Sequence, residues 1–199
     1  DINNNKLTID QISNGEMKGL GTGTFVWPAA HVLCKYLEIR YQSLSGYRVC
    51  DIGSGTGITG FAACLLDAKE IYLTDQENIL FLLENNKRLI LNQCQHINPT
   101  SLIIQQYNWG ESSDHLNPPF DLLLISDCVL PKLYPIDLLI QATIKLMDEN
   151  TIALFSYEHR VYPDYDPRQE FRRLCDINNL KVINIPLSDH HPLYRCEDI

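Results

Sequence analysis

The fold is decided by the stretch from residue 49 to residue 60, which reads Val49-Cys50-Asp51-Ile52-Gly53-Ser54-Gly55-Thr56-Gly57-Ile58-Thr59-Gly60. The apolar run at residues 48–52 predicts a short strand that leads into the glycines. After the glycines, apolar residues recur at helical spacing from residue 58 to residue 66. Because glycine has no Cβ, such a turn brings the backbone close to a bound molecule. We therefore expect a ligand site at this turn.

Two overlapping glycine patterns predict different ligands. Gly55-x-Gly57-x-x-Gly60 fits a dinucleotide fingerprint, in which a helix N-terminus faces a pyrophosphate. Asp51-x-Gly53-x-Gly55-x-Gly57 fits S-adenosylmethionine, which carries a sulfonium, an ammonium and a carboxylate but no phosphate. An acidic residue in the loop would repel a phosphate and accept hydrogen bonds from the ammonium group, so S-adenosylmethionine is favoured. A nicotinamide-dependent oxidoreductase stays open as an alternative. The binding residues predicted here are Asp51, Gly53, Ser54 and Gly55.

A second acidic residue supports an adenosine-containing ligand. Asp75 follows the next predicted strand, 20 residues after Gly55. A carboxylate at a strand end can bind both ribose hydroxyls, as it does in dinucleotide-binding folds. Asp75 is therefore a candidate cofactor-binding residue, although it does not choose between the two ligands. It is also suited to cap the helix that starts near Gln76.

Strands and helices alternate along the rest of the chain. Apolar runs predict further strands at residues 70–74, 102–107, 120–125 and 152–156. Helical spacing recurs at residues 29–37, 76–92, 136–147 and 171–175. Pro28 begins the first of these helices, and Asp166, Pro167 and Gln169 resemble an N-cap, a first-turn proline and a capping-box partner for the last. Residues 182–185 and 193–196 predict two final strands, close enough in sequence to pair as a hairpin.

This order predicts a doubly wound α/β domain with a mostly parallel, seven-stranded sheet that ends in an antiparallel hairpin. The strand at residues 120–125 is almost entirely apolar, as expected when helices cover both faces of a parallel sheet. We interpret residues 1–23 as a polar N-terminal lead and residues 24–199 as a single domain. No repeat or low-complexity linker indicates a second domain.

Composition narrows the classes of function. The 199 residues include 25 Asp and Glu against 16 Lys and Arg, a formal net charge of −9, which argues against nucleic-acid binding. Apolar runs fall short of the roughly 20 residues of a membrane-spanning helix, and no secretory signal is visible. The seven cysteines and six histidines show no metal-ligand spacing. We therefore expect a protein that binds no metal, does not contact a membrane, and is located in the cytoplasm or also in the nucleus.

Four further motifs point to a known family: Val26-Trp27-Pro28-Ala29-Ala30, Thr74-Asp75, Asn108-Trp109-Gly110 and Ser126-Asp127-Cys128-Val129. With the glycine stretch, they make nearly the whole chain resemble the seven-β-strand protein-lysine methyltransferases, also called family 16 methyltransferases. The resemblance implies a class I, Rossmann-like methyltransferase fold and S-adenosylmethionine as methyl donor. It also implies a non-histone protein substrate that presents a lysine, such as a chaperone or a translation factor. We expect a monomer.

The resemblance assigns further site residues. It implies that Trp27 and Trp109 line the cofactor pocket, where an indole face can attract a sulfonium or stack on adenine. Ser126 follows the fourth strand, where its backbone would contact the adenine or ribose side of the ligand.

Asp127 begins the motif that faces the substrate lysine in the family, and we predict it to be the catalytic residue. A nearby carboxylate raises the pKa of an amine, so Asp127 would position the incoming ammonium rather than act as a strong base. Leu130 stands where the family has tyrosine, and Tyr134 is a candidate to replace that tyrosine. Tyr157 resembles the end of the family's fifth strand and is a second candidate for the rim of the site. This difference favours one alternative, a cofactor-binding interaction module with weak or no turnover. A small-molecule methyltransferase, which would share the pocket but need a closed substrate cavity, stays open as another.

Overall fold

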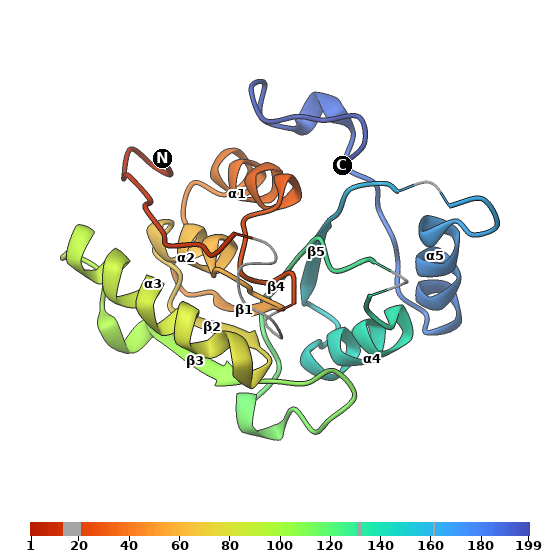
Figure 1. The fold of residues 1–199 in the computed structure, drawn as a ribbon, viewed down its shortest axis with the longest axis horizontal. Coiled ribbons are helices and arrows are strands. Elements are labelled where there is room, and N and C mark those ends of the chain that lie inside the picture. The colour runs from red at the N-terminus through yellow and green to blue at the C-terminus, as the bar shows by residue number, and fades with distance from the viewer. Residues whose placement is uncertain (14–20, 131–132, 161) are drawn as a thin grey trace.

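The computed structural model describes residues 1–13, 21–130, 133–160 and 162–199. Its centre is a five-stranded sheet in the order β3-β2-β1-β4-β5, and every pair of neighbours is parallel (Figure 1). The strands are β1 (Arg48–Ile52), β2 (Glu70–Asp75), β3 (Leu102–Gln106), β4 (Leu122–Ser126) and β5 (Ile152–Ser156). The predicted α/β class with a parallel sheet is confirmed.

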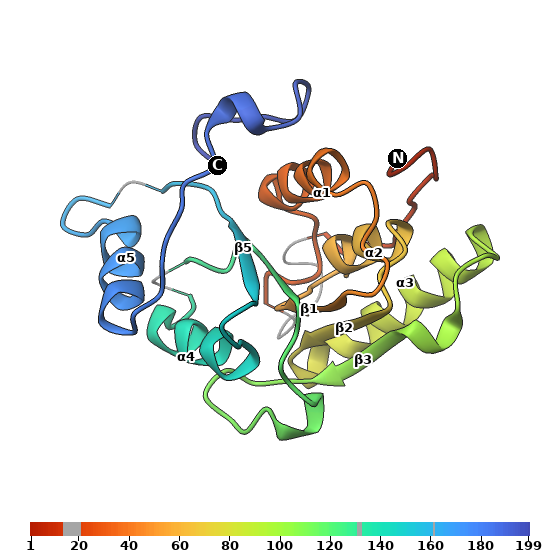
Figure 2. The same ribbon diagram turned by 180° about the vertical axis from the view of Figure 1, so that it is seen from behind.

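Helices cover both faces of the sheet, as the views from the front and from behind show (Figures 1 and 2). α1, α2 and α3 pack on one face, and α4 and α5 pack on the other. The helices are α1 (Pro28–Arg40), α2 (Ile58–Leu65), α3 (Leu80–Gln93), α4 (Ile136–Leu146) and α5 (Pro167–Ile177). Because strand order reverses between β1 and β4, the helices that follow these two strands lie on opposite faces and leave a crevice at the carboxyl ends of the strands.

Local signals set the helix boundaries. Pro28 is the first residue of α1, where its missing N–H costs no hydrogen bond. The Asp166 carboxylate caps α5 by accepting a hydrogen bond from the Arg168 N–H at 2.9 Å. The side-chain amide of Gln169 reaches only that carboxylate, at 3.4 Å, so the cap is confirmed without the full capping box. A 3₁₀ turn at Glu77–Ile79 precedes α3.

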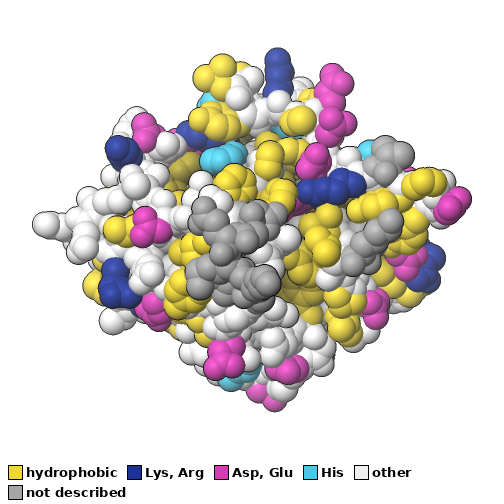
Figure 3. Space-filling view, viewed as in Figure 1, with side chains coloured by type: hydrophobic (Ala, Val, Ile, Leu, Met, Phe, Trp, Pro, Cys, Tyr) yellow, Lys and Arg dark blue, Asp and Glu magenta, His cyan; other side chains and the backbone are white. Residues whose placement is uncertain are grey.

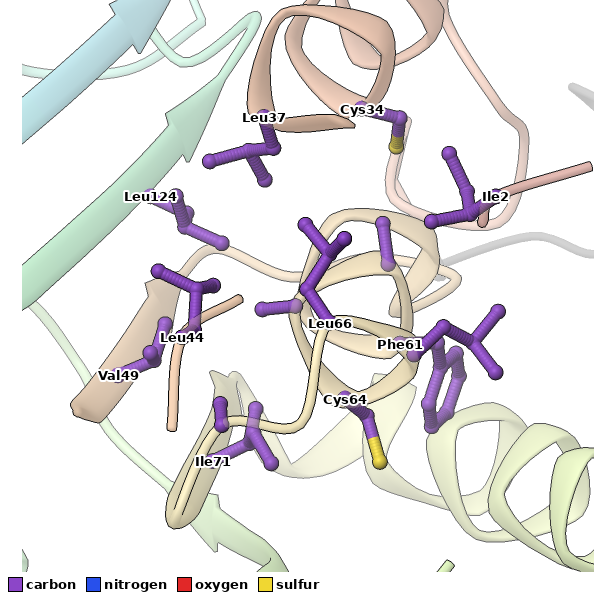
Figure 4. Close-up of a cluster of buried hydrophobic side chains, with 14 of the residues drawn as sticks. Ile2, Cys34, Leu37, Leu44, Val49, Phe61, Cys64, Leu66, Ile71 and Leu124 are labelled. Atoms are coloured by element: carbon purple, nitrogen blue, oxygen red, sulfur yellow. The ribbon is translucent and has the colours of Figure 1, made fainter. Parts of the chain in front are cut away.

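Two hydrophobic cores hold the helices to the sheet. Between the sheet and α1, α2 and α3 lies a cluster that includes the fully buried Leu37 and Phe61 (Figure 4). Ile2, from the predicted polar lead, is 3% exposed and belongs to the same cluster. The first residues of the chain thus pack against the domain, whereas residues 14–20 of the lead lie outside the described residues. The boundary at residue 23 stays a prediction.

The prediction of two further strands in a terminal hairpin is wrong. Residues 178–199 contain no strand, and they run from α5 to the outer side of α1 (Figures 1 and 2). The predicted strands lack a buried face, since Ile183 is 70% exposed and Leu193 is 85% exposed. Pro186 follows the first predicted strand and Pro192 precedes the second, and neither proline has an N–H to donate to a sheet. Ring contacts to α1 hold the segment instead: Tyr36 meets His190 with ring centroids 6.4 Å apart.

Within the described parts of the chain, every helix is too short or too polar to cross a lipid bilayer.

One fully buried amide ties the N-terminal segment and the glycine loop to α3. Asn86 donates to the carbonyl oxygens of Asp10 and Thr56, both at 2.9 Å, and accepts from the Asp10 N–H at 2.6 Å. Replacing Asn86 with alanine leaves these buried groups without partners, so we expect the free energy of unfolding to fall by about 3 kcal/mol. Urea unfolding will measure the loss. The neighbouring Asn85→Ala variant is the control and should stay within about 0.5 kcal/mol of the wild type; equal losses in the two variants would contradict the account.

Candidate active site

A cavity of about 410 Å³ lies at the carboxyl ends of β1, β2 and β4. This is the place where the order of the strands changes direction, and open α/β sheets bind their ligands there. The glycine loop at residues 53–56 forms one wall. Residues from segments 21–30, 58–59, 75–79, 107–109, 126–128 and 133–138 complete the lining. The cavity therefore gathers all of the predicted site residues except Asp51.

The glycine loop leaves no room for side chains at two of its positions. Gly55 has a φ of +55°, and a Cβ there would lie 2.6 Å from the carbonyl oxygen of Gly23. Gly53 has a φ of +66°, and its Cβ would lie 3.0 Å from the Cys128 Sγ, closer than side chains normally approach. Ser54 holds the loop to β2, because its hydroxyl donates to the carbonyl oxygen of Asp51 at 2.8 Å and accepts from the Thr74 N–H at 2.8 Å. The loop thus presents its backbone to the cavity.

Asp75 lines the cavity at the end of β2, as the sequence predicts for a ribose-binding carboxylate. One of its oxygens accepts from the Gly55 N–H at 2.7 Å, and the other accepts from the Gln76 N–H at 2.7 Å. Burial raises the pKa of Asp75, while these two hydrogen bonds lower it. A carboxylate accepts up to about four hydrogen bonds, so Asp75 keeps the capacity to accept from a ligand.

Asp51 lies outside the described lining of the cavity, and its side chain points to the start of α2. One oxygen accepts from the Thr59 hydroxyl at 2.6 Å and from the Gly60 N–H at 2.8 Å. The other oxygen is buried without a partner among the described residues. Burial raises the pKa of Asp51 to about 7. A direct contact between Asp51 and the cofactor stays a prediction.

The raised pKa of Asp51 predicts a pH dependence of stability. Between about pH 4 and pH 7 the folded chain keeps a proton on Asp51 that the unfolded chain has lost, so stability contributed by Asp51 falls as pH rises through this window. Asparagine can accept the same two hydrogen bonds without ionising. We expect the free energy of unfolding of Asp51→Asn to decline less than that of the wild type from pH 4 to pH 7 in urea titrations. Parallel declines would show that Asp51 ionises equally easily in both states.

Three aromatic side chains form another part of the cavity wall. The Trp27 indole N–H donates to the Thr22 carbonyl oxygen at 3.0 Å. Trp109 meets Tyr134 edge to face, with ring centroids 5.7 Å apart. The hydroxyl of Tyr134 is hydrogen-bonded to the hydroxyl of Thr22. Both tryptophans therefore line the cavity together with Tyr134, the tyrosine proposed to replace the missing family tyrosine.

Two cavity residues carry buried polar atoms that have no hydrogen-bond partner among the described residues: the hydroxyls of Tyr107 and Ser126. Burial raises the pKa of Tyr107 to about 12, so its hydroxyl stays protonated at neutral pH. Buried polar groups are costly unless they find partners, and a ligand can supply them. Together with the bare glycine backbone and the Asp75 carboxylate, these hydroxyls fit a ligand that is rich in hydrogen-bonding groups, as the adenosine part of S-adenosylmethionine is.

Asp127 also lines the cavity, and its backbone has the left-handed φ of +53°. Its carboxylate forms a bidentate ion pair with Arg160, with N–O distances of 3.0 and 2.9 Å. It also accepts from the Glu158 N–H at 3.2 Å. The carboxylate predicted to position the substrate ammonium is therefore engaged by the segment after β5. Its direct role toward a substrate stays a prediction.

Leu130, at the position of the family tyrosine, and Tyr157, the second candidate for the rim of the site, do not line the cavity. Leu130 is 7% exposed, and Tyr157 packs against Phe171 with ring centroids 6.0 Å apart. Neither is among the described residues that line the cavity. Of the two tyrosine candidates, the structure brings only Tyr134 to the site.

Sequence reasoning missed Tyr107, Thr22 and Arg160. A signal existed for Tyr107, because it follows β3 at the carboxyl edge of the sheet, where ligands bind. Thr22 precedes the first recognised motif, and the partner of Arg160 is 33 residues away in the sequence. These two contacts become visible only in the folded chain. No group of three or more potential metal ligands occurs among the described residues.

Comparisons with known proteins show the family of this chain. Residues 2–174 match the lysine methyltransferase family. Protein N-lysine methyltransferase METTL21A of Danio rerio is 34% identical over 180 residues, which are 89% of this chain and 78% of the relative. The METTL21A of Mus musculus is 32% identical over 183 residues, covering 92% of this chain and 80% of the relative.

A solved structure supports the fold. The ribosomal protein L11 methylase of Lactobacillus delbrueckii subsp. bulgaricus has a TM-score of 0.52 and 20% identity, covering 75% of this chain and 66% of its own. The match to the lysine methyltransferase family over most of the chain decides between the two glycine patterns and against a nicotinamide-dependent oxidoreductase. The chain belongs to the lysine methyltransferase family, and its methyl donor is S-adenosylmethionine.

Proposed function

We propose that this enzyme transfers a methyl group from S-adenosylmethionine to the side-chain amine of a lysine in another, non-histone protein. The observation that carries the proposal is the mouth of the cavity. Its lining residues Phe25 and Leu133 are 38% and 61% exposed, so the cavity opens between apolar side chains at the surface. On the face in Figure 3, hydrophobic side chains gather above the centre and on both sides of it. A lysine on a folded protein can extend its long aliphatic stem into such an opening.

The proposed chemistry needs alignment more than acid–base catalysis. S-adenosylmethionine supplies a methyl group on a positively charged sulfur: the amine lone pair forms the new N–C bond, the electrons of the S–C bond remain on sulfur, and the amine proton leaves to water. The chain has to bind both molecules, hold them in line and exclude competing water. Trp27, Trp109 and Tyr134 supply an aromatic wall that suits cationic groups without adding a negative charge.

The same residues suggest how the donor is held. We propose that Asp75 accepts hydrogen bonds from the ribose hydroxyls, and that the hydroxyls of Ser126 and Tyr107 bind polar groups of the adenosine part. The backbone of Gly53, Ser54 and Gly55 would face the amino-acid part. This assignment is supported by the spare acceptor capacity of Asp75 and by the two buried hydroxyls that lack partners.

Leu130 supports a second candidate function. Leu130 is buried in place of the family tyrosine, which favours an interaction module that binds S-adenosylmethionine with little turnover. Tyr134 favours catalysis, since it lines the cavity beside Trp109.

For the protein partner of this enzyme, we propose a chaperone or a translation factor. For the location, we propose the cytoplasm or nucleus, because six of the seven cysteines are buried free thiols.

The test is methyl transfer to proteins of a cell extract from isotopically labelled S-adenosylmethionine, followed by mass spectrometry of the labelled peptides. We expect one or a few proteins to carry the label on lysine. An Asp75→Asn enzyme, assayed in parallel, should leave the same proteins unlabelled. Label on arginine, or only on small molecules, would refute lysine as the acceptor. Binding of S-adenosylmethionine with no transferred label would favour the interaction module.

A further inference from the structure

A cluster of charged side chains at the edge of the cavity lies outside the roles assigned so far. Arg160 pairs with both oxygens of Asp127 and also with Glu158, at a distance of 2.9 Å. Its guanidinium lies 6.0 Å from the ring centroid of Trp27. Arg160 thus connects the residue after β4, the segment after β5 and the tryptophan that precedes α1, two of which line the cavity.

The hydrogen bonds of Asp127 show what this pair does to the carboxylate. Its two oxygens accept three hydrogen bonds, two from Arg160 and one from the Glu158 N–H. The Asp127 side chain is only 3% exposed, whereas the Arg160 side chain is 24% exposed. A buried carboxylate with a bidentate guanidinium partner has little tendency to exchange it for a monodentate ammonium, because removing one partner of a buried pair is costly.

The charge of Asp127 matters for the reaction, because an ammonium has no lone pair with which to form a bond to the methyl group. A free carboxylate near the cavity would attract the lysine as its ammonium form and keep it protonated. The carboxylate paired with Arg160 has lost most of this attraction. We propose that Arg160 is a positioning residue for methyl transfer: it holds Asp127 as an ion pair, so that the cavity receives the neutral amine rather than the ammonium. This inference rests on the proposed lysine methylation.

Other charged and titratable groups around the pair are few. Glu158 and Tyr162 face Arg160 from the segment after β5. Cys128 and Tyr134 interact electrostatically with both Asp127 and Asp75, and Cys128 also interacts with Asp51. Burial keeps the thiol and the phenol protonated by raising the pKa of each. Asp75 engages two backbone N–H groups, and the Glu158 side chain is 43% exposed to solvent, so Asp127 is the buried carboxylate that loss of Arg160 would release.

The test measures binding of n-butylamine, which has the length and charge of a lysine side chain, to the protein saturated with S-adenosylhomocysteine. Isotope-labelled n-butylamine can be titrated by NMR from pH 7 to pH 11. For the wild type, we expect affinity to increase with pH, as the neutral amine forms. For Arg160→Met, we expect the ammonium at pH 7 to bind about tenfold more tightly than it binds to the wild type, since a released carboxylate shifts an amine pKa by at least about one unit.

Three variants make the result specific. Arg160→Lys keeps a positive charge beside Asp127 and should bind the ammonium as weakly as the wild type. The double variant Arg160→Met with Asp127→Asn removes the released carboxylate and should also return to weak binding. Arg160→Gln can keep one hydrogen bond to Asp127 without the charge, and it replaces Arg160→Met if that variant does not fold.

The inference is overturned if loss of the Arg160 charge leaves ammonium binding within twofold of the wild type, or if the gain persists in the double variant. Because the titration needs no protein substrate and no turnover, it separates this inference from the proposed function. If the labelling of cell extract fails and the titration succeeds, the proposed function is wrong but the effect of Arg160 on Asp127 stands. If the labelling succeeds and the titration fails, only the role of Arg160 is wrong.

Discussion

Replacing Asp75 with asparagine is expected to lower the affinity for S-adenosylhomocysteine by about 100-fold, the loss of roughly two hydrogen bonds to a charged group. Both carboxylate oxygens of Asp75 accept from backbone N–H groups, those of Gly55 and Gln76. The amide nitrogen of asparagine can only donate, so one of these N–H groups loses its acceptor whichever way the side chain turns. The backbone around Asp75 is then held less firmly at the place where the ribose is proposed to bind.

Isothermal titration calorimetry will measure this loss. Glu77→Gln is the matched control. It also removes one negative charge, but at an exposed position that lies two residues after Asp75. We expect Glu77→Gln to bind S-adenosylhomocysteine like the wild type. If Asp75→Asn and Glu77→Gln bind equally well, Asp75 has no part in holding the ligand, and its role is limited to capping the turn after β2.

Replacing Gly55 with alanine is expected to abolish measurable binding of S-adenosylhomocysteine and to lower the free energy of unfolding by about 2 kcal/mol or more. The left-handed φ of +55° accounts for part of the loss of stability, because a Cβ is unfavourable there. The remainder comes from the approach of that Cβ to within 2.6 Å of the Gly23 carbonyl oxygen. The segment at residues 21–27 then has to move, and it carries Trp27 of the cavity wall.

Gly46 offers a control with the same kind of backbone and no contact. Its φ is +90°, and a Cβ there would meet nothing within 4 Å. Gly46→Ala should therefore lose only about 1 to 2 kcal/mol, the backbone part of the effect, and should bind the ligand normally. Calorimetry and urea unfolding of both variants will separate the two contributions. Normal binding by Gly55→Ala would show that the close approach of the two segments does not shape the cavity.

The sequence predicted the parallel part of the fold because local signals agree there with burial. An apolar strand such as residues 122–126 has both faces covered, and the glycines at positions 53 and 55 are required by the backbone itself. The terminal strands failed for the opposite reason. Ile183 and Leu193 look apolar in the sequence, but nothing in the described chain buries them. A short apolar run predicts a strand only where a neighbouring strand and a core are present to receive it.

The site could be predicted in outline for similar reasons. Asp75 and Trp109 follow strands, so the common edge of a parallel sheet brings them together. Asp51 has the same kind of motif signal, yet its side chain turns to α2, because Thr59 and Gly60 in the first turn of α2 donate hydrogen bonds to it. The pairing of Arg160 with Asp127 depends on how the segment after β5 returns to the cavity. No spacing in the sequence records that return.

The most direct test of the account is a crystal structure of the protein with S-adenosylhomocysteine. We predict that the ligand occupies the cavity at the carboxyl ends of β1, β2 and β4, with its ribose hydroxyls hydrogen-bonded to Asp75 and with the hydroxyls of Ser126 and Tyr107 no longer without partners. A ligand found elsewhere on the molecule, or a ribose that avoids Asp75, would contradict the account.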